Sequence, residues 1–192
     1  MAPVRIAPNI GSYVGGDITA GVFASLIWNQ PEFSLFIDLG TNGEIAFGNE
    51  DFLVSCACSA GPAFEGGDIS CGMRATDGAI EACAIDRDTM EPTFHIVGEA
   101  GQKPVGLCGS GIIDTISELY RCGIINAKGL FVKEGPRVAR DRHGMGRYIL
   151  AHPQESAAER EIALNEVDID NFIRAKGAIF SAIETLLNAV DM

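Results

Sequence analysis

The sequence has 192 residues, of which 47% are hydrophobic and 21% are charged. This length suits one well-buried domain, and this balance excludes a disordered or fibrous chain. The 14 basic and 26 acidic residues give a net charge of −12, which argues against nucleic-acid and membrane-surface partners because it repels phosphate and anionic lipid. No apolar run reaches the roughly 18 residues of a membrane-spanning helix, so we do not expect a membrane protein.

The six cysteines stand mostly in apolar or glycine-rich surroundings, at positions 56, 58, 71, 83, 108 and 122. The N-terminus lacks the apolar core of a signal peptide, so we expect buried, reduced thiols in a cytoplasmic protein. Cys56 and Cys58 alternate along a predicted strand, which places both on one face without any metal. Because no second pair stands at zinc or iron–sulfur spacing, the sequence predicts no metal site.

The first predicted helix opens at Asp17, a suitable N-cap. Ile18, Val22 and Leu26 recur at four-residue spacing and form one apolar stripe, and Pro31 ends the helix.

Short β-type runs follow at residues 34–38, 44–48 and 52–58. The dipeptide Asn42-Gly43 between the first two runs is a strong hairpin signal, because both residues tolerate positive φ. These features predict a three-stranded antiparallel meander.

A glycine-rich loop over residues 59–74 leads to a second predicted hairpin, and helix and strand signals alternate after it. The expected elements are strands at 78–86 and 93–98, a helix from Gly109 to Gly123, an irregular basic stretch at 126–147, a strand at 147–151 and a long helix from about Asp168. The sequence therefore predicts an α/β fold of the ribonuclease-H-like kind, in which helices pack on a mixed sheet.

The segment around Asp38 is the most informative one for chemistry. Asp38 ends a hydrophobic strand, and the turn Gly40-Thr41-Asn42-Gly43 follows at once. Backbone N–H groups and the Thr41 hydroxyl could face phosphate oxygens, while Asp38 could hold water on Mg²⁺. Composition alone favours the alternative that Asp38 only caps a hairpin turn, since glycine-rich turns are common in β-containing folds.

Two further glycine-rich segments allow two interpretations each. The loop at 59–67 either lines a cleft, presenting Glu65 to Mg²⁺ or water beside Gly66, or crosses close to the sheet. Gly109, Ser110 and Gly111 begin a helix whose N-terminus could accept an anion. The alternative, which we favour slightly, is that these small residues allow close packing of the helix on the sheet.

Taken together, these segments resemble the C-terminal ATPase region of the reductive activators of corrinoid proteins. That family is similar to actin, heat-shock chaperones and acetate and sugar kinases, the ASKHA superfamily. The resemblance runs through residues 8–21, 36–44, 55–76, 106–113 and 169–179 in order.

The resemblance implies a role for each candidate residue. The whole protein would carry a ferredoxin domain with a [2Fe-2S] cluster, a linker, and a two-lobed ATPase that binds ATP and Mg²⁺ between its lobes. The Asp38 hairpin resembles the second of two phosphate hairpins, with Asp38 catalytic. The implied nucleotide contacts are Gly40, Thr41, Asn42, Gly43, Glu65, Gly66, Gly109, Ser110 and Gly111.

A first phosphate hairpin, an adenosine loop and a ferredoxin cysteine pattern are not seen in the sequence. We therefore expect residues 1–192 to be a single domain, the second lobe of an excised ATPase, with little activity of its own.

In the parent protein, the implied function is the ATP-dependent return of Co(II) corrinoid proteins to Co(I). The implied partners are a corrinoid protein and the remainder of the polypeptide, and a homodimer is left open. A small-molecule kinase of the same superfamily and a non-catalytic docking domain are the alternatives.

Overall fold

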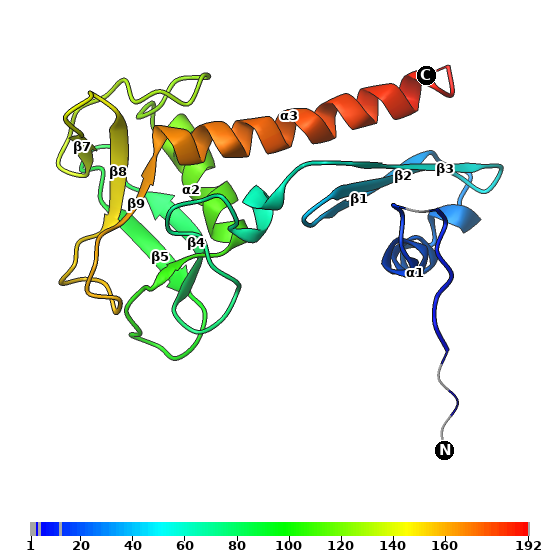
Figure 1. Cartoon of the computed structure of the whole chain (residues 1–192), viewed down its shortest axis with the longest axis horizontal. Helices are drawn as coiled ribbons and strands as arrows, with labels where there is room; N and C mark the ends of the chain where they lie inside the picture. The colour runs from blue at the N-terminus through cyan, green and yellow to red at the C-terminus, as the bar shows by residue number, and fades with distance from the viewer. Residues whose placement is uncertain (1–2, 4, 12, 192) are drawn as a thin grey trace. The chain divides into compact units, whose positions relative to one another are not determined.

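The computed structural model describes residues 3, 5–11 and 13–191, which form two compact units (Figure 1). Unit 1 comprises residues up to Ala60 together with those from Lys176 onward, and unit 2 comprises Gly61–Ala175. The sequence predicts one domain over residues 1–192. That both units belong to one lobe stays a prediction.

Unit 1 is built on the meander that the sequence predicts. Strands β1 (Ser34–Leu39), β2 (Gly43–Gly48) and β3 (Leu53–Cys58) pair antiparallel in the order β1-β2-β3. Helix α1 (Gly16–Ser25) packs against β1 and β2, and a 3₁₀ turn (Ile27–Asn29) follows it. A small core joins them, made of Val14, Ile18, Val22, Ile27 and Ala46.

The two ends of α1 differ from their sequence-based prediction. The N-cap is Gly15, and Asp17 lies inside the first turn, where its Oδ1 accepts a hydrogen bond from the Ile18 N–H at 2.9 Å. In the first turn, the Asp17 carboxylate still interacts favourably with the positive end of the helix dipole. The helix ends at Ser25 because Leu26 adopts a left-handed conformation with φ of 61°, and Leu26 is exposed instead of completing the apolar stripe.

Unit 2 contains two further three-stranded sheets and the larger core. In the first sheet, β4 (Ala79–Ile85) lies between β5 (Pro92–Ile96), its antiparallel partner, and β6 (Gly106–Leu107), its parallel partner. The second sheet has the order β7 (Val138–Arg140), β8 (Gly146–Ala151) and β9 (Ile162–Asn165), all antiparallel. The α/β fold class is confirmed, but the described strands form three separate sheets where one mixed sheet was predicted.

Helix α2 (Gly109–Arg121) packs on β4 and provides hydrogen-bond acceptors for backbone N–H groups of that strand. Beyond the short strand β6, the β4 backbone has no neighbouring strand on that side among the described residues, and α2 supplies carboxylates as acceptors. Asp114 Oδ2 accepts from the Cys83 N–H at 3.2 Å, and Glu118 Oε2 accepts from the Ile85 N–H at 3.0 Å. Backbone donors that a sheet would have paired are thus satisfied by a helix.

Helix α3 (Glu166–Asn188) follows β9 directly and runs through both units. Its first turn is capped by Asn165, whose Oδ1 accepts from the N–H groups of Val167 and Asp168. The first part of α3 packs into the unit 2 core, and Ile179 and Leu186 are buried in unit 1. In the described part of the chain, no helix is both long and apolar enough to cross a membrane.

Candidate functional site

The hairpin predicted around Asp38 is present at the β1–β2 connection. Leu39 pairs with Gly43, and within the turn the Gly40 N–H donates to the Asn42 carbonyl at 3.1 Å. Thr41 and Asn42 are exposed, while Asp38 is half-buried and pairs across the hairpin with Glu44. The turn therefore offers an exposed hydroxyl and an exposed amide beside two carboxylates. Its role in binding phosphate stays a prediction.

Three carboxylates gather on one side of this hairpin. The pKa of Glu44 is raised, first by its partial burial and then by the charges of Asp17 and Asp38. The sequence pattern predicts only a capping role for Asp17 and no role for Glu44. The signal that could have found Glu44 is the pairing itself, because a three-residue turn sets Asp38 opposite Glu44.

Gly43 is required at this turn for a steric reason. Neither Asn42 nor Gly43 has a positive φ, so the conformational reason given by the sequence pattern is wrong. A Cβ on Gly43 would lie 2.8 Å from Cys58 Sγ and 2.9 Å from Ile179 Cγ1. The absent side chain lets β3 and α3 approach β2 closely.

Glu65 ends the 3₁₀ turn Pro62–Glu65 in unit 2, and Gly66 follows it. Gly66 has φ of 82° and donates its N–H to the Ala63 carbonyl at 3.1 Å. A Cβ on Gly66 would lie 2.7 Å from the Met73 nitrogen. Gly66 therefore fits the close-crossing interpretation of this loop, and the proposed role of exposed Glu65 toward Mg²⁺ or water stays a prediction.

Gly109, Ser110 and Gly111 form the first turn of α2, as predicted. A Cβ on Gly109 would collide with the Phe64 carbonyl, and one on Gly111 would collide with the Ile80 carbonyl. These two glycines are thus needed for packing against the Pro62–Glu65 turn and against β4. Ser110 is exposed, and its Oγ lies 3.4 Å from Cys108 Sγ.

The candidate residues fall into two groups, one in each unit. The structure brings Glu65 and Gly66 against the start of α2, since α2 contacts the Pro62–Glu65 turn. The Asp38 hairpin belongs to unit 1.

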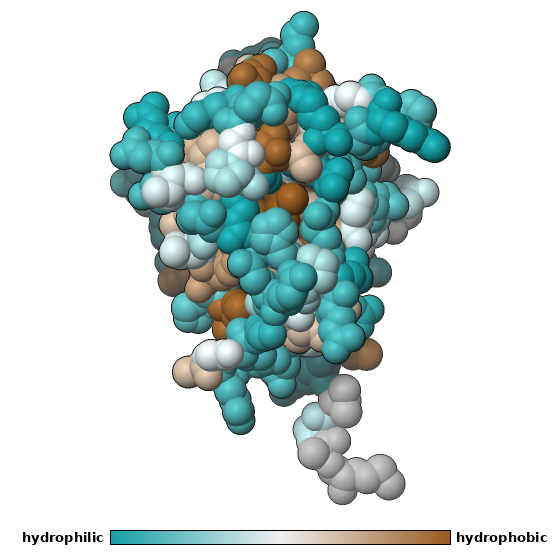
Figure 2. Space-filling view, turned by 90° about the vertical axis from the view of Figure 1, so that its left-hand side faces the viewer, coloured by the Kyte–Doolittle hydropathy of each residue, from teal (hydrophilic) through white to brown (hydrophobic). Residues whose placement is uncertain are grey.

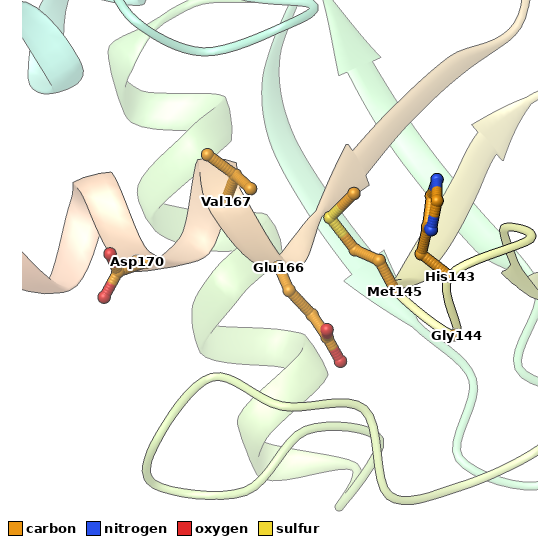
Figure 3. Close-up of a pocket in the computed structure, with 6 residues that line it drawn as sticks. All are labelled: His143, Gly144, Met145, Glu166, Val167 and Asp170. Atoms are coloured by element: carbon orange, nitrogen blue, oxygen red, sulfur yellow. The ribbon is translucent and has the colours of Figure 1, made fainter.

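A separate depression of about 370 Å³ opens on unit 2 and contains none of the predicted site residues. Figure 3 shows Glu166, Val167 and Asp170 at the start of α3, facing residues 143–145 of the β7–β8 connection. The two carboxylates point in different directions, and Glu166 Oε1 already accepts from the Phe131 N–H at 3.0 Å. The polar side chains that line this pocket therefore do not point at one common position where they could bind a ligand together.

The basic residues between 133 and 147 are mostly engaged within unit 2. Arg137 bonds Glu91 and Glu155, Arg140 bonds Glu134, and Arg147 bonds Glu161. The face shown in Figure 2 is mainly hydrophilic, with hydrophobic residues in small separate groups. These pairings leave little free positive charge to attract an acidic partner.

Four of the six thiols are poorly suited to act as thiolates. Burial is the main reason that the pKa of Cys71 rises to about 12 and that of Cys83 to about 11, and partial burial also raises the pKa of Cys56 and Cys58. Within the residues that the structure describes, no group of three or more His, Cys, Asp or Glu side chains could hold a metal ion.

Comparison with known proteins identifies relatives along almost the whole chain. The family model described as the C-terminal domain of RACo, the ASKHA domain, matches residues 32–192. The corrinoid activation enzyme RamQ of Eubacterium limosum is 35% identical over 93% of this chain and 30% of its own length. The Co(II) methylated amine-specific corrinoid protein reductase of Methanosarcina barkeri is 28% identical over 96% of this chain and 34% of its own length.

A solved structure agrees with these matches. The reductive activator for corrinoid, iron-sulfur protein is 48% identical, with a TM-score of 0.89 over 98% of this chain and 30% of its own. The chain thus spans about a third of the length of the relatives it matches. The match to residues 32–192 shows that the chain belongs to the family of the C-terminal ASKHA domain of RACo.

Proposed function

We propose that this chain is part of an ATP-dependent reductive activator that returns Co(II) corrinoid proteins to Co(I). The observation that carries the proposal is the family match, together with relatives named for corrinoid activation or reduction. Because those relatives are about three times longer, the activity would belong to a longer polypeptide. A corrinoid protein would be its partner, and the electron would come from an iron–sulfur cluster outside these residues.

The chemistry of the Asp38 hairpin fits a nucleotide phosphate that arrives with Mg²⁺. The carboxylates of Asp17, Asp38 and Glu44 make this region negative, since the charges of the two aspartates add to partial burial in raising the pKa of Glu44. A bare phosphate would be repelled there. A phosphate neutralised by Mg²⁺ would not be. Thr41 and Asn42 present exposed polar groups that could donate to phosphate oxygens.

Within this proposal, each residue has a limited task. Asp38 would orient water on Mg²⁺, an outer contact that suits an ion that keeps much of its hydration shell. Residues 40–43 would bind phosphate, while Glu65, Gly66 and Ser110 at the start of α2 stay candidate nucleotide contacts within unit 2. Bound Mg-ATP would supply the free energy that makes the reduction of cobalt feasible.

Six free thiols with no disulfide between them fit a reducing cytoplasm.

Steady-state phosphate release tests the proposal in four samples: the chain alone, the full-length protein, and its Asp38→Ala and Asp51→Ala variants. We expect slow release from the chain alone, because half of the phosphate contacts are expected elsewhere, and fast release from the full-length protein. Asp38→Ala should abolish that release. Asp51→Ala is the matched control, since Asp51 is an exposed aspartate on the β2–β3 turn, and it should leave the rate unchanged.

Equal rates in all four samples would contradict the role given to Asp38 and the division of the site. Mg-ATP binding that is unaltered in the Asp38→Ala variant would instead favour a docking role for this hairpin. Transfer of the phosphate to an added small-molecule acceptor would favour a kinase.

A further inference from the structure

Three phenylalanines cluster at the end of the unit 1 sheet that lies opposite the Asp38 hairpin. Phe33 directly precedes β1, Phe47 lies in β2 and Phe52 directly precedes β3. The centroid of the Phe33 ring lies 5.6 Å from that of Phe47, with the rings nearly parallel, and 5.7 Å from that of Phe52. Phe47 is buried, but Phe33 is 49% exposed and Phe52 is 37% exposed. These two outer rings form an aromatic patch that faces solvent.

The two chain segments that carry the aromatic patch are joined by hydrogen bonds around Asn49. This residue is 5% exposed, its Nδ2 donates to the Pro31 carbonyl at 3.1 Å, and its N–H donates to the Phe52 carbonyl at 2.9 Å. Beside it, the Glu50 N–H donates to the Gln30 carbonyl at 2.9 Å. The aromatic patch thus stands on a fixed base, which lowers the entropy cost of binding to it.

Unit 1 carries an unbalanced negative charge around this patch. It contains eight acidic residues and two basic ones, and the sequence has no lysine, arginine or histidine between Arg5 and Arg74. Among the described residues, every ion pair lies in unit 2. Glu32 and Glu50 are exposed, and each stands in one of the two joined segments. The aromatic patch is therefore flanked by carboxylates that no cation of unit 1 neutralises.

We propose that the aromatic patch of Phe33 and Phe52, with its two flanking glutamates, binds an arginine-bearing segment of a separate partner protein. Arginine suits both parts of this surface, because its planar guanidinium stacks on aromatic rings and also bonds carboxylates. Its weak hydration lowers the cost of bringing a charge onto an apolar surface. A symmetric contact between two copies of this chain is disfavoured, since like charges would then meet.

The aromatic patch lies at the other end of β2 from the candidate phosphate turn. The inference follows from the rings, their fixed base and the charges of unit 1. It therefore does not depend on the proposed ATPase function.

The peptide acetyl-Leu-Arg-Leu-Arg-amide serves as the probe, and an analogue with citrulline in place of arginine removes the charge while keeping the side-chain shape. Titration of the nitrogen-15-labelled chain, followed by NMR, locates the contact and gives its affinity. We expect the arginine peptide to shift the amides of residues 32–34 and 49–53. The citrulline peptide should bind about two- to fivefold more weakly, because the cation–π contact is lost.

Variants of the chain separate the contributions of the rings and the carboxylates. Phe52→Ala should weaken binding of the arginine peptide by about two- to fivefold, the range of one cation–π contact at an exposed site. The double change Glu32→Gln and Glu50→Gln leaves the rings intact and should weaken binding by a similar factor. Phe180→Ala and Glu184→Gln are the matched controls, since both side chains are exposed on α3, and they should leave the affinity unchanged.

Equal binding of the arginine and citrulline peptides would overturn the proposal, as would shifts centred on the Asp38 hairpin or no shifts at millimolar peptide. Shifts of the same amides that depend on protein concentration without peptide would assign the aromatic patch to a second copy of the chain instead. Fluorescence anisotropy compares the chain with the full-length protein. Binding of a labelled arginine peptide to the chain alone would show that the longer polypeptide covers the patch, and would overturn the assignment to a separate partner.

Discussion

At Gly43 the backbone of β2 lies against the side chains of Cys58 and Ile179. A methyl group added at this position would lie 2.8 Å from Cys58 Sγ and 2.9 Å from Ile179 Cγ1, separations that are too short for real carbon contacts. Both neighbours belong to elements with their own constraints, since Cys58 lies in β3 and Ile179 is buried in α3. A methyl group there must therefore displace a strand or a helix.

We expect Gly43→Ala to lower the free energy of unfolding by about 1–3 kcal/mol, the usual cost of overpacking a filled site. Urea denaturation followed by circular dichroism measures the change. Gly11→Ala is the control, since a Cβ at Gly11 would meet no atom within 4 Å, and it should change stability little. Equal stability of the two variants would show that the contact at Gly43 relaxes without cost.

Glu118 should make stability depend on pH. The Arg121 guanidinium and the Ile85 N–H lower the pKa of Glu118 from 4.5 to about 2. Because the folded state has the lower pKa, the stabilisation is complete above pH 4.5 and is lost as the pH falls through about 2. We expect Glu118→Gln to cost about 1 kcal/mol at pH 7 and less at pH 2.

Chemical denaturation of Glu118→Gln and of the unchanged protein between pH 7 and pH 2 measures this difference. The exposed α3 residue Glu184 provides a control in Glu184→Gln, which should show no such convergence. A constant difference across the pH range would contradict the assignment to Glu118.

Among the secondary-structure elements, the start of α3 is fastened to a loop by Asp168. This residue is 2% exposed, and its Oδ1 accepts from the Ser70 N–H at 2.8 Å and the Ser70 hydroxyl at 2.9 Å, while Oδ2 accepts from the Asn165 N–H at 3.0 Å. Ser70 adjoins Cys71, whose carbonyl accepts from the Leu107 N–H at 2.8 Å in β6. The Asp168 carboxylate thus holds the start of α3 to the loop that contains Ser70, and that loop is in turn bonded to β6.

We expect Asp168→Ala to destabilise unit 2 by about 3 kcal/mol, because it removes three hydrogen bonds to a buried carboxylate, from the Ser70 N–H, the Ser70 hydroxyl and the Asn165 N–H. Ser70→Ala removes only the hydroxyl bond and should cost about 1 kcal/mol. Hydrogen exchange at residues 69–73 and 106–107 measures the local effect. Similar costs for the two variants would show that the backbone bond to Ser70 matters little.

The elements that sequence reasoning missed are the short ones. The longer segments carry several turns or alternations of pattern, and β1–β5, β8, α2 and α3 all lie close to their expected positions. Strands β6, β7 and β9 have two, three and four residues, which is too little for a periodicity to show. The parallel pairing of β4 with β6 joins residues far apart in sequence, which no local pattern encodes.

The candidate site shows the same limit. The Asp38 hairpin could be predicted because its turn residues are adjacent in the sequence. Asp17 could not be placed beside it from the sequence, because α1 meets the hairpin only through tertiary packing. The steric roles of Gly109 and Gly111 likewise depend on carbonyls of Phe64 and Ile80, which lie far earlier in the sequence.

In the molecule as a whole, the two units have cores of different size. The unit 1 core joins five buried residues around α1 and β2, with Phe36 and Ala57 packed against it. The unit 2 core is much larger and includes fully buried side chains such as Ile80, Leu119 and Tyr148. Because hydrophobic burial supplies most of the stabilising free energy, unit 2 should be the more stable of the two.

We expect unit 1 to open before unit 2 as denaturant is added. Native-state hydrogen exchange measures both, through the amides of β2 in unit 1 and of β4 in unit 2. Ile18→Ala empties a fully buried site in unit 1 and should cost about 2–5 kcal/mol, lowering protection in β2 with little effect on β4. Leu119→Ala is the matched change in unit 2 and should lower protection in β4. Loss of protection in both strands with either variant would mean that the two units unfold together as one cooperative body. The difference in core size would then give the units no difference in their free energies of unfolding.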